Sequence, residues 1–220
     1  MLLDALGYPL RNGGWIMIVI GAVFAVILDL FQFAPGVGWA VSVFGMGYFG
    51  SFYLRIVGTT MTDGDALPDW PDFADFSDDI LHPFLRLTGL LLLSFGPVVA
   101  CVVAVEESAQ HYWPVMAGML LWGCIYFPMA VVASSAFGSL FAALPHIVLP
   151  AIFRSLPVYA GAVVALVLVF LLSSEAQEFA ARLPYAGWLI AAAVWLYGLM
   201  FQARLIGLVY RSKQESLGWE

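Results

Sequence analysis

The sequence predicts an all-α membrane protein with six transmembrane helices. Three observations carry this prediction: 63% of the 220 residues are hydrophobic, only 10% are charged, and the apolar residues gather in six long stretches. Soluble domains average roughly 45–50% apolar and about 25% charged residues. A single water-soluble core cannot absorb this excess, so we expect residues 1–220 to form one membrane domain.

Each expected span is long enough, or nearly so, to cross the hydrocarbon core of a bilayer, which needs about 20 mostly apolar residues. The spans lie at about residues 14–33, 36–57, 85–104, 114–134, 157–173 and 187–207, and the fifth is the shortest. No small-residue cleavage site follows the first stretch, so we expect a span there and not a signal peptide.

The basic residues predict that both ends of the chain lie in the cytoplasm, because Lys and Arg are retained on that side of a membrane. With six spans and both termini inside, only Arg182 lies outside. Seven basic residues are then cytoplasmic: Arg11, Arg55, Arg86, Arg154, Arg204, Arg211 and Lys213. The net charge of −7 excludes a nucleic-acid partner, since phosphate binding needs a basic surface.

The negative charge is concentrated in the cytoplasmic loop between the second and third spans. Seven aspartates fall between residues 63 and 79, which leaves eight acidic and eight basic residues in the rest of the chain. Aromatic and aliphatic residues recur among them at helical spacing, which predicts a short amphipathic helix at the membrane interface. These are Trp70, Phe73, Phe76, Ile80, Leu81 and Phe84.

Three interpretations of this loop stay open. It is a solvated acidic face above an apolar anchor, a docking surface for a basic protein segment, or a cation site at Asp63-Gly64-Asp65. The cation site is the weakest, because a calcium loop of the EF-hand type needs further ligands and a distal Glu. The residues of the docking hypothesis are Asp69, Trp70, Asp72, Asp75, Asp78 and Asp79.

An internal repeat relates the second span to the sixth. Residues 35–58 and 184–207 coincide without gaps at seven positions, among them Trp39/Trp188 and Arg55/Arg204. Because two spans separate the pairs, spans 1–2 and 5–6 enter the membrane in the same direction, which predicts a parallel pseudo-twofold repeat. We expect Arg55 and Arg204 to anchor helix ends at the lipid headgroups or to bind a headgroup phosphate.

Ionisable residues inside a bilayer are costly and are therefore functional candidates. Asp29 lies near the outer end of the first span, and His146 lies within 141–153, a stretch too short to span. That stretch is expected to be a second interfacial helix, or a re-entrant one. Pro97 and Pro128 interrupt the third and fourth spans, where exposed carbonyls could contact a solute. No catalytic, metal-binding or cofactor-binding motif is present, so we expect a non-enzymatic protein without a cofactor.

Part of the sequence resembles an uncharacterised family of prokaryotic multi-pass membrane proteins. The resemblance covers about residues 8–90 and rests on Gly47-Tyr48, Arg55, Gly64, Leu67-Pro68-Asp69-Trp70-Pro71-Asp72 and Asp79. Leu144-Pro145 to Tyr159 is also similar, more faintly, to the Yip-type membrane-trafficking proteins. The first resemblance implies a prokaryotic inner-membrane location, and neither implies catalytic residues.

Two functions follow from these features. The first is a membrane scaffold or partner subunit, in which the acidic loop docks a basic protein segment or another membrane subunit. The second is a small pseudo-symmetric transporter or lipid-handling protein, with its site near the interrupted spans 3 and 4. Membrane lipids are expected partners in both.

Overall fold

The computed structural model describes most of the chain: residues 1–11, 13–32, 34, 36–62, 64–72, 74–105, 109–184 and 186–219. These residues form seven α-helices and no strand. After the short α1 (Leu2–Gly7) come α2 (Gly14–Gln32), α3 (Gly38–Met61), α4 (His82–Val105), α5 (Ala109–Phe137), α6 (Pro145–Ala181) and α7 (Gly187–Leu217). The six helices after α1 are long and apolar enough to cross a membrane, which confirms the expected number of apolar helices.

Glycine and proline set several helix boundaries. Gly36 has a φ of +83°, a left-handed conformation that reverses the chain between α2 and α3 at little cost only for glycine. Pro145 occupies the first turn of α6, where no intrahelical N–H is needed. α7 ends at Leu217, the next residue Gly218 is also left-handed, and Arg154 donates a hydrogen bond to the carbonyl of Leu217 at 3.2 Å.

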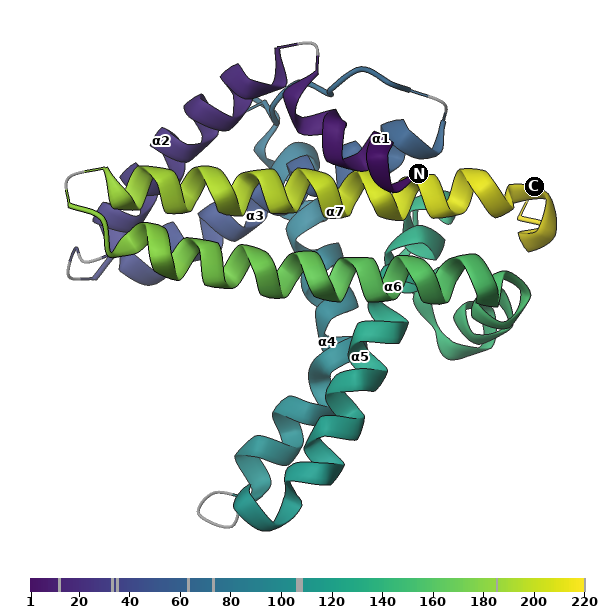
Figure 1. The fold of residues 1–220 in the computed structure, drawn as a ribbon. Coiled ribbons are helices and arrows are strands. Elements are labelled where there is room, and N and C mark those ends of the chain that lie inside the picture. The colour runs from purple at the N-terminus through teal and green to yellow at the C-terminus, as the bar shows by residue number, and fades with distance from the viewer. Residues whose placement is uncertain are drawn as a thin grey trace.

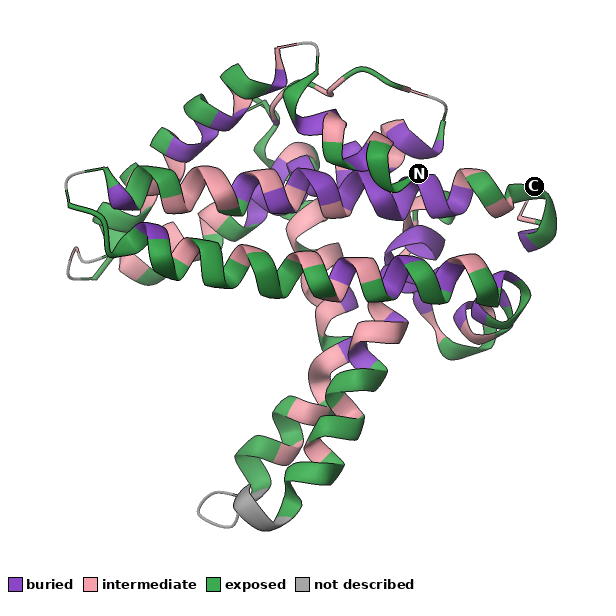
Figure 2. Ribbon diagram, viewed as in Figure 1, coloured by how far each residue is buried: buried purple, intermediate pink, exposed green. Residues whose placement is uncertain are grey.

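Helix α7 lies at the centre of the molecule and contacts α1, α2, α3, α5 and α6. Figure 1 shows α6 alongside it, with α1 and α2 on its opposite side. Helices α4 and α5 pack together as a hairpin whose far end projects away from the other helices (Figure 1). Figure 2 shows that this far end is mostly exposed, and its exposed side chains include Val103, Trp113 and Leu121.

Helices α3 and α7 run side by side in the same direction. The rings of Phe49 and Trp195 are 4.9 Å apart, and further along both helices Gly207 packs against Thr60. The predicted parallel repeat requires this shared direction. The arrangement is not fully symmetric, because the backbones of α2 and α7 approach each other closely whereas those of the described parts of α6 and α3 do not. The repeat therefore stays a prediction.

The acidic loop differs from the expected amphipathic helix. Residues 64–72, which we call the extended segment, have no helical structure, and a helix begins only at Phe76. It continues through a π-helical turn (Ser77–Leu81) directly into α4. Pro68 and Pro71 account for part of the difference, because each disfavours helix in the residue before it, Leu67 and Trp70.

The expected separate helix at 141–153 is also absent. A 3₁₀ turn (Leu140–Ala143) is followed by α6, which runs without a break from Pro145 through Pro150 and Pro157. Each internal proline removes one backbone hydrogen bond. The buried side chains of Val148, Ile152 and Ser155 pack this part of α6 into the core, which keeps the helix continuous.

Candidate functional site

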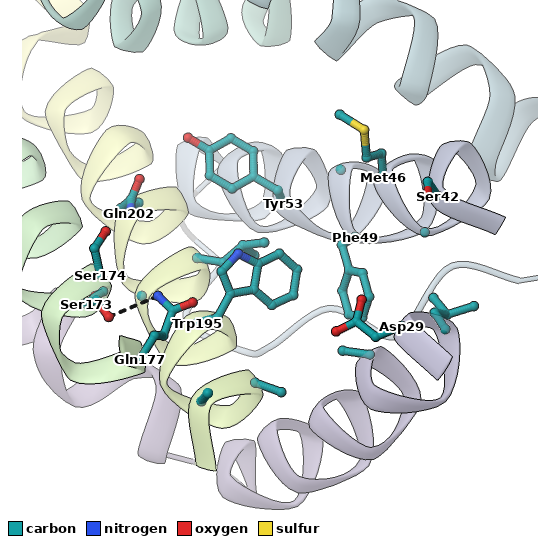
Figure 3. A pocket seen from close by; sticks show the side chains of 18 of the residues that line it. Asp29, Ser42, Met46, Phe49, Tyr53, Ser173, Ser174, Gln177, Trp195 and Gln202 are labelled. Carbon is teal, nitrogen blue, oxygen red and sulfur yellow. Dashed lines mark hydrogen bonds between the residues drawn. The ribbon is translucent and has the colours of Figure 1, made fainter. Parts of the chain in front are cut away.

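A cavity of about 870 Å³ lies between the α2–α3 and α6–α7 pairs (Figure 3). Its wall includes the ends of α2 and α6 and extends from the beginnings of α3 and α7 as far as Tyr53 and Gln202, so it lies toward one end of the bundle. Asp29, Ser174 and Trp188 on its wall are exposed, so the cavity reaches the molecular surface. Its volume falls in the range of small-molecule sites.

Aromatic side chains form much of the cavity wall. Phe49 from α3 and Trp195 from α7 meet edge to face at 4.9 Å between ring centroids. Behind the cavity, Phe49 also meets Trp70 of the extended segment at 6.1 Å. Gly198 permits α6 and α7 to approach here, since a Cβ at this position would lie 2.9 Å from the Ser173 Oγ.

The remaining wall carries a few polar groups, most of which already bond within their own helix. Gln32 Nε2 donates to Asp29 Oδ1 at 2.9 Å, and Gln177 Nε2 donates to the carbonyl of Ser173 at 3.0 Å. The other polar side chains of the wall are Ser42, Tyr53, Ser173, Ser174 and Gln202. Among the described residues that line the cavity, Asp29 alone is charged.

A second polar site surrounds Arg204, two residues beyond the cavity residue Gln202. The Arg204 side chain is only 2% exposed. Its Nη2 donates to Asp65 Oδ1 at 2.6 Å and to Asp4 Oδ2 at 3.0 Å. Nη1 donates to the carbonyl of Gly64 at 2.8 Å. The Tyr8 ring lies 4.7 Å from the guanidinium carbon, in cation–π geometry.

These contacts shift the ionisation of the groups around Arg204. Partial burial raises the pKa of the Asp4 carboxyl, but hydrogen bonds from Arg11 and Arg204 outweigh it and lower that pKa overall. The hydrogen bond from Arg204 lowers the pKa of Asp65. Burial raises the pKa of the Tyr8 phenol to about 12, so the ring facing the cation stays neutral. The buried Arg204 guanidinium is thus held by two carboxylates, of which Asp65 is itself exposed to solvent.

The burial of Arg204 corrects the prediction that it anchors a helix end at lipid headgroups. Arg55, its aligned counterpart in the repeat, forms an ion pair with Asp79 at 2.6 Å and is partly exposed. Both arginines therefore bind carboxylates of the acidic loop. Arg55 keeps enough exposure for a headgroup contact, whereas Arg204 does not.

The extended segment is fixed to the bundle by Trp70. Its indole stacks on Phe52 at 4.1 Å and on Tyr48 at 5.6 Å. Gly21 of α2 makes room for it, because a Cβ there would lie 2.8 Å from the indole. Trp70 therefore packs against the bundle while staying partly exposed, and its part in a docking surface stays a prediction.

The predicted docking carboxylates have separate environments. Asp79 is engaged internally by Arg55 and by the backbone N–H of Asp72 at 2.9 Å. Asp78 pairs with His82 at 3.0 Å, and Asp72 accepts from the N–H of Ala74. Exposed carboxylates that face outward are Asp69, Asp72, Asp75 and Asp78. Asp63 of the suggested cation site lies outside the described residues, and no group of metal-binding side chains occurs within them.

The two intramembrane candidates fall in different places. Asp29 lies on the cavity wall, whereas His146 is exposed on the first turn of α6 and does not line the cavity. Sequence reasoning missed Asp4, Tyr8 and Asp65 as partners of Arg204. Arg204 could be selected as one of the seven matched positions. Nothing in the sequence links it to Asp4 or Asp65, which lie 200 and 139 positions away from it in the chain.

Comparisons with protein families, curated proteins and solved structures find no match to this chain. The similarity around Leu67–Asp72 to a prokaryotic membrane-protein family, and that of 144–159 to the Yip-type proteins, therefore stay predictions.

Proposed function

We propose that the chain is a multi-pass protein of a prokaryotic inner membrane, with both termini in the cytoplasm. The six long apolar helices support the membrane location. The positive-inside bias supports the orientation. In this orientation the cavity faces the outer side of the membrane, because α2 and α6 end there and α3 and α7 begin there.

We further propose that the protein transports or handles an amphiphilic small molecule and has no enzymatic role. The observation that carries this proposal is the cavity between α2–α3 and α6–α7, the two pairs of the predicted repeat. Transporters built from repeats hold their substrates at such an interface. Apolar walls with a few polar groups suit a ligand with an apolar body and a polar head.

The expected site lies near the interrupted spans 3 and 4, which form only a small part of this cavity's wall. Pro97 and Pro128 lie inside continuous helices, and neither lines the cavity. Helices α4 and α5 contribute only the apolar Leu87, Leu91 and Phe127 to its wall.

Filling the cavity tests this function. Ala192 lines the cavity, so Ala192→Trp should remove at least about 90% of the specific binding of a neutral apolar fluorophore such as N-phenyl-1-naphthylamine. Ala160 is exposed and outside the cavity, so Ala160→Trp is the matched control and should bind like the unmodified protein. Binding is measured on protein in nanodiscs, with empty nanodiscs as background. Equal binding by all three proteins would contradict the proposal.

A docking function for the acidic loop is a second candidate, favoured by the outward-facing carboxylates of Asp69, Asp72, Asp75 and Asp78. An oligolysine peptide should bind the unmodified protein at low salt and lose its affinity when all four are replaced by Asn. Unchanged affinity of the fourfold variant would argue against docking.

A further inference from the structure

We propose that the cavity selects an amphiphilic cation, with Asp29 as the counter-charge for its head. This inference rests on the proposed function and names its class of ligand. Figure 3 shows Asp29 on the cavity wall, together with Phe49 and Trp195 from two other helices.

The first argument is the charge of the wall. Asp29 is the one ionisable carboxylate among the described lining residues, and no basic side chain stands beside it there. It has no ion-pair partner in the described part of the chain, and Gln32 supplies one neutral hydrogen bond to Oδ1. A carboxylate can accept about four hydrogen bonds, so it retains capacity for a ligand's donors.

The second argument is the membrane environment. An unpaired carboxylate near the hydrocarbon region is costly, and such groups pair with one another, with a substrate or with an ion. A cationic head beside Asp29 offsets this cost, whereas an anionic head adds like-charge repulsion. Fatty acids and anionic lipids are therefore disfavoured ligands.

The third argument is the aromatic lining. Phe49 and Trp195 form an edge-to-face pair, and Trp188 and Phe170 add further rings to the wall. Aromatic faces attract cations and also bury apolar groups. The cavity of about 870 Å³ has room for a bulky apolar body behind the charged head.

Two ions of nearly the same size and shape but opposite charge test the inference: tetraphenylphosphonium and tetraphenylborate. Binding to protein in nanodiscs of neutral lipid is measured by equilibrium dialysis. The binding measured with the filled-cavity variant Ala192→Trp is subtracted from that of the unmodified protein. This subtraction removes the contribution of ions that partition into the lipid. The unmodified protein should bind the cation at least about tenfold more tightly than the anion.

Variants of Asp29 then assign the preference. Asp29→Asn should weaken cation binding about tenfold and leave little discrimination between the two ions, whereas Asp29→Glu should keep the preference. Asp69→Asn removes an exposed carboxylate outside the cavity and is the matched control. Asp29 is exposed near the end of α2, so we expect its variants to fold like the unmodified protein. An unchanged thermal midpoint checks this.

The outcomes separate this inference from the function beneath it. Equal cavity binding of both ions, or a cation preference that survives in Asp29→Asn, overturns the cation assignment and leaves the cavity as a general amphiphile site. If Ala192→Trp changes the binding of neither ion and of no neutral probe, the proposed function is wrong and this inference falls with it.

Discussion

At the scale of single residues, Arg204 is the best-connected charge of the described chain. A guanidinium that is 2% exposed needs partners for its donors, since burying an unpaired charge is expensive. Asp4 and Asp65 accept hydrogen bonds from it, and in the chain Asp4 precedes α2 whereas Asp65 follows α3. The arginine could be selected from the sequence as a repeated position. Its partners could not, because pairing across 139 and 200 residues is decided by how the helices pack.

This network predicts a pH-dependent stability. The folded-state pKa values of Asp4 and Asp65 are lowered, so their stabilising contribution is complete above the ordinary aspartate pKa of about 4. It is lost as the pH falls through the lowered values. The thermal midpoint, followed by tryptophan fluorescence, should therefore drop below about pH 4. The double variant Asp4→Asn/Asp65→Asn should be less stable at pH 7 and show a smaller drop. If the thermal midpoint of the double variant fell with pH as steeply as that of the unmodified protein, this role of Asp4 and Asp65 would be contradicted.

At the scale of elements, the extended segment shows how two local signals compete. Aromatic spacing in residues 70–84 favours a helix and Pro71 suits its first turn, whereas both Pro68 and Pro71 disfavour helix in the residue before them. Packing overrides this preference at Pro150 and Pro157 of α6, but not at Leu67 and Trp70, the residues before Pro68 and Pro71. The direction of Trp70 could not be predicted, since its place depends on Gly21 and Phe52 of two separate helices.

The contact between α3 and α7 predicts different roles for two glycines that the repeat aligns. A Cβ on Gly207 would lie 2.4 Å from the Thr60 Cβ, whereas a Cβ on Gly58 meets nothing within 4 Å. We expect Gly207→Ala to destabilise the protein by about 1–3 kcal/mol through overpacking. Gly58→Ala, the matched control, should leave stability unchanged or raise it by up to about 1 kcal/mol. Thermal midpoints in one detergent measure both, and equal shifts would contradict close packing at Gly207.

At the scale of the whole molecule, composition was sufficient to predict six apolar helices, because hydrophobic length alone defines them. The cavity could not be predicted from the sequence. Its wall combines the ends of α2 and α6 with the beginnings of α3 and α7, and its volume depends on the gaps that these helices leave. Asp29 was predicted as a polar candidate, but only the fold places it beside aromatic residues of other helices.

The proposed topology predicts which residues a membrane-impermeant maleimide reaches in intact cells. In a background without Cys101 and Cys124, Ser174→Cys on the cavity wall should react from outside, because α6 ends on the outer side. Ser216→Cys, near the exposed end of α7, should react only after the membrane is permeabilised. Pre-incubation with tetraphenylphosphonium should slow the reaction at Ser174→Cys and not at Ser216→Cys. The opposite labelling pattern would invert the orientation, and it would place the cavity on the cytoplasmic side.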